Sequence, residues 1–152
     1  MSIRVERDKE FWRKVLFHDD VKDTLLDLSP DEFLECITSP VVTPLADIHG
    51  GFICARVGST PLVQEFHTAF LPEGWGREVH NAAKEAIGYM FNNGVKLLIT
   101  YEDKNNPRSR PPKSFGFETD TGPNNKYQLW FLSLGNWLAS PAYRRLQCPP
   151  SH

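Results

Sequence analysis

Residues 62–76 read LVQEFHTAFLPEGWG, an alternating segment that runs into two glycines. Side chains of an extended strand point alternately to its two faces, so a strand through His67 has two different faces. One face carries an acid and an imidazole, and the other is mostly apolar and aromatic. The first face holds Val63, Glu65, His67 and Ala69, and the second holds Gln64, Phe66, Thr68 and Phe70.

A helix is predicted to begin beside these glycines. From Arg77 the apolar residues recur every three or four positions, the spacing of one buried helical stripe. They are Val79, Ala82, Ala83, Ala86, Ile87 and Met90. Asn93-Gly94 is a typical helix end, and the segment from Lys96 to Tyr101 has the composition of a buried strand. Strand, glycine turn, helix and strand form one crossover unit. The turn is either only a helix entry or, through the free N–H groups of the helix start, a phosphate site.

The flanking segments predict further helices and an antiparallel meander. Ser29-Pro30-Asp31-Glu32 is a capping box that starts a short helix. Glycine pairs and turns separate alternating runs, which is typical of hairpins. The expected elements are a helix over 10–18, strands over 41–48 and 52–57 joined at Gly50-Gly51, a strand containing Phe115-Gly116-Phe117, a strand over 127–132 and a helix over 136–145. The aromatics near Trp130 and Trp137 are expected on the surface, as a partner site.

Composition excludes several classes of protein. The 152 residues fit one domain with a core, and 40% of them are hydrophobic. With 17 basic and 19 acidic residues the net charge is −2, which gives no electrostatic basis for a nucleic-acid partner. No apolar run has the length of a membrane span, and the segment MSIRVERDKE lacks the apolar core of a signal peptide. The three cysteines lack metal-ligand spacing, so we expect a cytoplasmic protein without a metal site.

The order of elements resembles the GNAT family of acyl-CoA-dependent N-acyltransferases. The telling features are Leu71-Pro72-Glu73-Gly74-Trp75-Gly76 before the long helix, similar to the family's pyrophosphate loop, and Asn105-Asn106 followed by Phe115-Gly116-Phe117, similar to its N…GF pattern. The resemblance implies an α/β (α+β) single-domain fold over residues 1–146, with a central, mostly antiparallel mixed sheet flanked by helices. Residues 147–152 would be a flexible tail.

The resemblance also implies a function, in which an amine attacks the thioester of acetyl-CoA directly. The acceptor would be a small-molecule amine or a protein amino group. The residues expected to bind acetyl-CoA are Leu71, Gly74, Trp75, Gly76, Arg77 and Asn105. A general base must take the proton of the attacking ammonium, and Glu65 or His67 is expected to do so. The alternative is that Glu65 pairs with an arginine and His67 is structural. His49 is interpreted as a turn residue and His80 as solvated.

The chain departs from the family pattern in the loop. Aligned on Gly74 and Gly76, Leu71 replaces the family's Gln or Arg. Aligned on the preceding Pro-Glu pair, Trp75 replaces an arginine, and Glu78 places a carboxylate where it would repel a diphosphate. Pro111-Pro112 interrupts the helix expected after the asparagines. Four basic residues follow the asparagines or flank them, and they either form a solvated loop or bind the ribose phosphate of coenzyme A or an acidic partner. They are Lys104, Arg108, Arg110 and Lys113.

The family's usual tyrosine acid has no counterpart here, because neither Tyr101 nor Tyr127 matches its position. These departures favour a second hypothesis, a GNAT-like scaffold without catalysis that serves as a structural or interaction protein. Degenerate proteins of this kind occur in bacteriophages, which implies a virion location and protein partners within the virion. We favour the acetyltransferase hypothesis, because the scaffold can use water as a base and work without the tyrosine.

Overall fold

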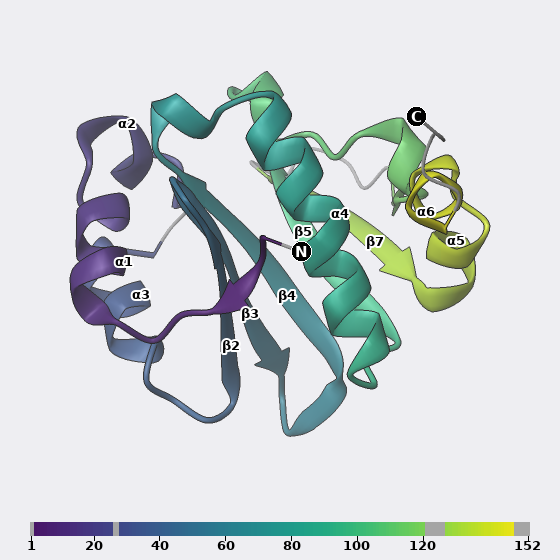
Figure 1. Cartoon of the computed structure of the whole chain (residues 1–152), viewed down its shortest axis with the longest axis horizontal. Coiled ribbons are helices and arrows are strands. Elements are labelled where there is room, and N and C mark those ends of the chain that lie inside the picture. The colour runs from purple at the N-terminus through teal and green to yellow at the C-terminus, as the bar shows by residue number, and fades with distance from the viewer. Residues whose placement is uncertain (1, 26–27, 121–126, 148–152) are drawn as a thin grey trace.

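The computed structural model describes residues 2–25, 28–120 and 127–147. Within these residues a seven-stranded mixed sheet has the strand order β1-β2-β3-β4-β5-β7-β6 and is flanked by helices (Figure 1). The fold class predicted from the sequence is confirmed. The strands are β1 (Arg4–Val5), β2 (Val42–Asp47), β3 (Gly50–Val57), β4 (Thr60–Phe70), β5 (Leu97–Asp103), β6 (Glu118–Thr119) and β7 (Tyr127–Ser133). The helices are α1 (Lys9–Leu16), α2 (Asp19–Lys22), α3 (Pro30–Cys36), α4 (Arg77–Asn92), α5 (Leu134–Leu138) and α6 (Pro141–Gln147).

The first half of the sheet is an antiparallel meander, as predicted, but its first turn lies elsewhere. Gly50 and Gly51 belong to β3 and pair with Asp47 and Ala46 of β2, so the turn consists of Ile48 and His49. The reason is steric. A side chain on Gly51 would meet the backbone of β2 at 1.9 Å, so this glycine permits close strand approach and does not make the turn.

The crossover unit predicted from residues 62–101 is present. α4 begins at Arg77 after the 3-10 turn η1 (Pro72–Gly74), buries the predicted alanine, isoleucine and methionine stripe, and ends at Asn92 with Asn93 as its C-cap. Gly94 follows with φ 99°, a left-handed conformation that favours glycine. β5 then returns parallel to β4, which makes this pair the parallel junction of the sheet.

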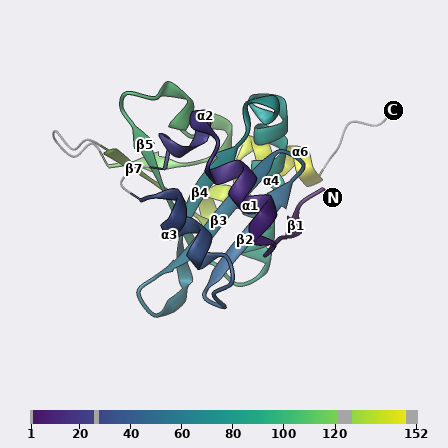
Figure 2. The same cartoon turned by 90° about the vertical axis from the view of Figure 1, so that its left-hand side faces the viewer.

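The sheet has one core on each face. α4, α5 and α6 cover one face through a cluster that includes Phe52, Phe66 and Leu98. α1, α2 and α3 cover the other face, where Trp12 and Leu16 pack on residues of β2, β3 and β4. The predicted start of α3 is confirmed, since the Ser29 side chain caps the helix by accepting from the Glu32 N–H at 3.2 Å. Figure 2 shows α1–α3 lying over β2–β4, with β5 and β7 extending beyond them.

The C-terminal third corrects three expectations. Phe115 ends the 3-10 turn η3 (Lys113–Phe115), and Gly116 has φ 91°, so Phe115-Gly116-Phe117 is not a strand. The tail contains two short helices, α5 and α6, in place of one. Trp137 is buried in the core against Phe115 and Tyr143, so it is not part of an exposed aromatic surface. The predicted tail lies outside the described residues, except for Gln147.

Candidate functional site

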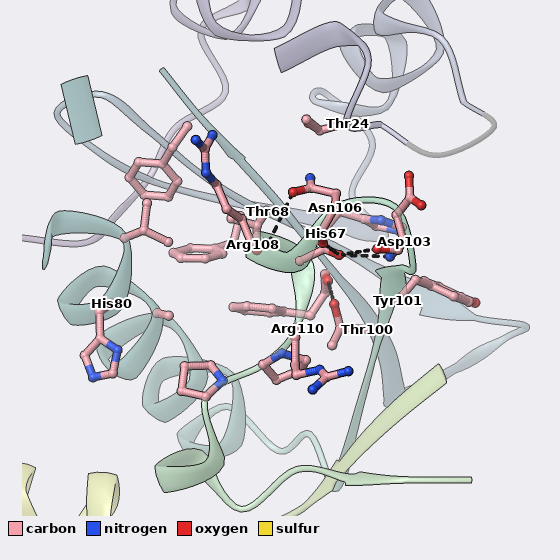
Figure 3. Close-up of a pocket in the computed structure, with 18 of the residues that line it drawn as sticks. Thr24, His67, Thr68, His80, Thr100, Tyr101, Asp103, Asn106, Arg108 and Arg110 are labelled. Atoms are coloured by element: carbon pink, nitrogen blue, oxygen red, sulfur yellow. Dashed lines mark hydrogen bonds between the residues drawn. The ribbon is translucent and has the colours of Figure 1, made fainter. Parts of the chain in front are cut away.

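The site begins where the parallel strands separate. β4 and β5 pair over only three residue pairs, from Val63↔Leu97 to Glu65↔Ile99, although the strands continue to Phe70 and Asp103. Above the last pair, the Thr100 hydroxyl donates to the Phe66 carbonyl at 2.9 Å in place of a ladder bond. A cavity of about 400 Å³ occupies the resulting gap (Figure 3).

This cavity passes through the sheet from one face to the other. On the α4 side it is lined by apolar residues of β4 and α4, including Phe66, Val79 and Ile87. On the α1–α3 side it reaches His67 and Tyr101, and Thr24 lies across the cavity from His80 in the close-up (Figure 3). A long ligand can therefore enter along α4 and present its end to the opposite face.

A backbone N–H group points into the gap at Thr68. The carbonyls of Leu62 and Phe66 accept hydrogen bonds from the β5 side, through Lys96 N–H and the Thr100 hydroxyl. Alternate residues of a strand direct their backbone groups to the same side, so Thr68 also directs its N–H toward β5. At that height β5 has diverged, and the N–H faces the cavity that Thr68 lines. It can donate to a ligand carbonyl.

The start of α4 fits a diphosphate. Gly76, just before the helix, has φ 95°, and a side chain there would meet no atom within 4 Å. Among the described residues no side chain caps this helix, so the first-turn N–H groups have no side-chain acceptor. Because unpaired N–H groups and the helix dipole attract anions, the open backbone at Gly76 can hold phosphate oxygens.

Gly74 has a different role from Gly76. It is buried, and a side chain there would meet Glu78 Oε2 at 2.9 Å and His49 Cβ at 3.1 Å. His49 Nδ1 lies 2.8 Å from Glu78 Oε1, and the His49 N–H donates to Glu78 Oε2 at 3.1 Å. The Glu78 carboxylate is thus held against the β2–β3 turn. The expectation that Glu78 repels a diphosphate stays a prediction, and the contact with His49 is a partner that the sequence did not indicate.

Trp75 and Arg108 connect the segment that follows β4 with the segment that follows β5. The Arg108 guanidinium lies 4.0 Å from the centre of the Trp75 ring, and the indole N–H donates to the Phe70 carbonyl at 3.0 Å. Arg108 belongs to the 3-10 turn η2 (Pro107–Ser109) after β5, whereas Trp75 precedes α4. The contact therefore joins the segments that follow the two separated strands, and both residues line the cavity.

Glu65, His67 and Tyr101 form a polar cluster on the other face. His67 Nε2 lies 3.2 Å from Glu65 Oε2, and the rings of His67 and Tyr101 stack at 6.2 Å. The hydrogen bond from His67 lowers the pKa of Glu65, assisted by the His67 charge and by Tyr101 and opposed by burial. Burial raises the pKa of Tyr101, and the Glu65 carboxylate raises it further. Glu65 pairs with His67 and not with an arginine.

The predicted site residues occupy different places. His67, Trp75 and Gly76 line the cavity. Leu71 is buried in the core under α1–α3, and its N–H donates to the His49 carbonyl at 2.8 Å. Arg77 is exposed at the start of α4, and the exposed Asn105 donates its N–H to Asp103. Glu65 lies beside His67, whereas Leu71, Gly74, Arg77 and Asn105 do not line the cavity.

Several cavity residues were missed by sequence reasoning. Tyr101 and Thr68 lie on strands that were predicted correctly. Only the register of β4 against β5 shows that the two residues line the same cavity. His80 was interpreted as solvated, but it packs on Phe115 at 5.0 Å and lines the cavity. Burial, and then the charges of Lys84 and Arg145, lower the pKa of His80.

Two further observations concern other kinds of site. Across residues 2–25, 28–120 and 127–147, no three His, Cys, Asp or Glu side chains are grouped as metal ligands would be. In the same part of the chain, no helix combines the length and apolar character that spanning a membrane requires.

The chain was compared with known proteins by sequence and by structure. No family model matches the sequence, and no match to a curated protein was found. Solved structures of acetyltransferases do match. A mutant spermidine N-acetyltransferase from Vibrio cholerae superposes with a TM-score of 0.66 at 16% identity, covering 90% of this chain and 95% of that one.

Two other structures give the same result. A GCN5-related N-acetyltransferase from Brucella melitensis has a TM-score of 0.62 at 18% identity, covering 96% of this chain and 81% of that chain. An acetyltransferase from Thermus thermophilus has a TM-score of 0.62 at 12% identity, and the match covers 88% of this chain and 98% of that chain. At such identities the likeness concerns the fold, and all three proteins share it with this chain.

Proposed function

We propose that this chain, which has the GNAT fold, is an acetyl-CoA-dependent N-acetyltransferase that acts on a primary amine. The observation that carries the proposal is the cavity in the gap between β4 and β5, because it joins an anion-compatible helix start to an imidazole on the opposite face. A scaffold without catalysis has no need of such a passage. The relatives named above act as acetyltransferases by their descriptions, which supports the same reading.

Acetyl-CoA would supply an activated acetyl thioester, and the residues of this chain divide the work of binding it. The open backbone at Gly76 and the first-turn N–H groups of α4 would hold the diphosphate. Phe66, Val79 and Ile87 form an apolar channel for the arm of the molecule. The Thr68 N–H would donate to the acetyl carbonyl oxygen, where negative charge develops during attack.

His67 would take the proton from the attacking amine. It lines the cavity, whereas Glu65 lies beside it and is absent from the lining. When the Glu65 carboxylate accepts a hydrogen bond from the Nε2–H of His67, it favours the imidazole tautomer in which Nδ1 carries no proton. Nδ1 can then accept the proton of the amine. In this arrangement Glu65 is a positioning residue and His67 is the base. The lowered pKa of Glu65 keeps its carboxylate ionised, which suits this role.

Calorimetric titration with acetyl-CoA tests the proposal. We expect binding of micromolar strength, on the order of 8 kcal/mol, and its loss in Gly76→Glu, which adds a charge beside the diphosphate. Gly58→Glu is the matched control: Gly58 also has positive φ, 67°, and open space around it, but lies in the β3–β4 hairpin. Binding that survives Gly76→Glu would remove the loop from the site.

Turnover is then measured as thiol release with a panel of primary amines. Binding without thiol release for any amine would exclude the enzymatic proposal and leave an acyl-CoA-binding protein. No heat of binding at millimolar acetyl-CoA, with the fold intact, would favour the scaffold without catalysis, including the virion-associated form.

A further inference from the structure

The strand register assembles a group of apolar side chains beside Glu65 and His67. Residues that lie opposite each other in neighbouring strands share a face of the sheet. Val63 pairs with Leu97, and Glu65 with Ile99. Ile99 in turn pairs with Phe131, and Tyr101 with Leu129. The apolar platform, as we define it, consists of Val63, Leu97, Ile99, Tyr101, Leu129 and Phe131.

Helices α1–α3 leave this platform open. Every one of its six residues is partly exposed. The core cluster beneath those helices takes its strand residues from β2, β3 and β4 and includes none from β5 or β7. In Figure 2 the two strands project past the helices on the same side of the molecule. Among the described residues, no apolar cluster covers the platform.

The platform is continuous with the catalytic cluster. Tyr101 belongs to it and also stacks on His67 at 6.2 Å, while Glu65 lies in the same row as Ile99 and Phe131. Glu65 is ionised, since its pKa is lowered by His67. A ligand on the platform would thus have its charged end at a carboxylate and an imidazole, and its body on aliphatic and aromatic side chains.

We propose that the acceptor is a primary amine carried on an apolar aliphatic or aromatic body, which docks on Ile99, Tyr101, Leu129 and Phe131 with its ammonium at Glu65 and His67. This inference rests on the proposed function, since it names the amine for the same site. Charge and shape support a small amine, because the platform spans a few side chains and one of its ends lies at the Glu65 carboxylate. Glu118, which pairs with Phe131, is exposed at the edge of the sheet.

Steady-state kinetics with 2-phenylethylamine, ethanolamine and spermidine test the inference. We expect the highest kcat/KM for 2-phenylethylamine. Leu129→Thr should raise the KM for that amine by about tenfold, with kcat and acetyl-CoA affinity unchanged. Threonine keeps the strand propensity. Leu62→Thr is the matched control, because Leu62 is an exposed leucine on the opposite face of β4, and it should leave the KM unchanged.

A second readout separates failure of the inference from failure of the proposed function. Titration of the free protein with 2-phenylethylamine, followed by NMR, should show binding that Leu129→Thr weakens by about the same factor. Acetyl-CoA binding without this amine binding would overturn the inference alone. Amine binding without acetyl-CoA binding would overturn the proposed function, and the platform would then be an amine-binding site without acetyl transfer.

A polyamine or a second copy of the chain could occupy the platform instead, and each would give a different result in these experiments. A preference for spermidine that Glu118→Gln abolishes would show that a second charge is recognised, and would overturn the apolar acceptor. A concentration-dependent dimer that Leu129→Thr dissociates would show that a second copy of the chain covers the platform, with the same consequence.

Discussion

His67 and Glu65, two residues apart on one face of β4, have their side chains 3.2 Å apart, and of the two only His67 lines the cavity. This arrangement separates the two roles that a base and its orienting group require. In the proposed function the imidazole would reach the reacting amine, and the carboxylate would hold the imidazole. The cluster is built on a strand, so its geometry depends on the sheet and not on a loop.

Replacing Glu65 by glutamine should lower kcat by about a hundredfold or more, since an amide can donate to His67 Nε2 and favour the wrong tautomer. Acetyl-CoA affinity should not change, because Glu65 does not line the cavity. Single-turnover kinetics and calorimetry measure the two quantities. An unchanged kcat would exclude Glu65 as the positioning residue of His67.

The same pair predicts how stability depends on pH. The pKa of Glu65 is below its ordinary value of 4.5 in the folded state, so the unfolded chain binds the proton first as pH falls. The ionised Glu65 carboxylate contributes its full stabilisation above the ordinary pKa of the unfolded chain. This contribution is lost as pH falls through the lowered pKa of the folded state. The stability difference between the parent and Glu65→Gln should follow this course in urea unfolding. A difference that grows with acidification would contradict the sign of the shift.

Thr68→Pro tests the backbone N–H directed into the gap. Proline removes that N–H, and no ladder bond to β5 is lost at this height. We expect kcat to fall by about a hundredfold with a smaller change in acetyl-CoA affinity. Thr68→Val is the control, because it removes the hydroxyl and keeps the N–H. Equal loss of turnover in both variants would assign the effect to the side chain.

The crossover unit could be predicted from sequence because its signals are local. Strand alternation, the glycine turn and the α4 stripe lie within one stretch of chain. The Phe115-Gly116-Phe117 expectation failed because Gly116 takes a left-handed conformation, with φ 91°. A side chain there would meet the Asn136 backbone at 2.8 Å, and nothing near Gly116 in the sequence encodes that neighbour.

The sequence did not predict that Gly74 and Gly76 have different roles. Both glycines precede α4, and the family pattern aligned on Gly74 and Gly76 treats them as one motif. The contact that distinguishes them is the His49–Glu78 pair, which joins residues 29 positions apart and packs against Gly74. The site at Tyr101 likewise depends on the register of β4 against β5, which local patterns do not specify.

Trp75 and Arg108 should show a measurable coupling. A double-mutant cycle with Trp75→Leu and Arg108→Gln is expected to give about 0.5–1 kcal/mol, the usual size for an exposed cation–π contact. The contact is 4.0 Å from cation to ring centre. Arg4 over Phe11, at 5.2 Å, provides a control cycle elsewhere in the molecule. If the changes in unfolding free energy caused by the two single substitutions add up to the change in the double mutant, the Trp75 and Arg108 side chains are not energetically coupled.

His80 should make the protein less stable as it is protonated. Its pKa lies below the ordinary 6.5, because burial, and then the charges of Lys84 and Arg145, oppose the imidazolium. The unfolded chain therefore binds the proton at higher pH than the folded chain does. Stability is highest above the ordinary pKa and falls as pH drops toward the lowered one, after which the loss is complete.

Two variants isolate this effect from the other histidines. His80→Gln should remove part of the loss of unfolding free energy between about pH 7 and pH 5, since glutamine does not titrate and suits a helix. Lys84→Gln should raise the pKa of His80, measured by NMR titration of its imidazole, because one opposing charge is gone. A His80 pKa above the ordinary value would contradict the burial of its ring, and a pKa unmoved by Lys84→Gln would show that the charge of Lys84 does not act on the imidazolium.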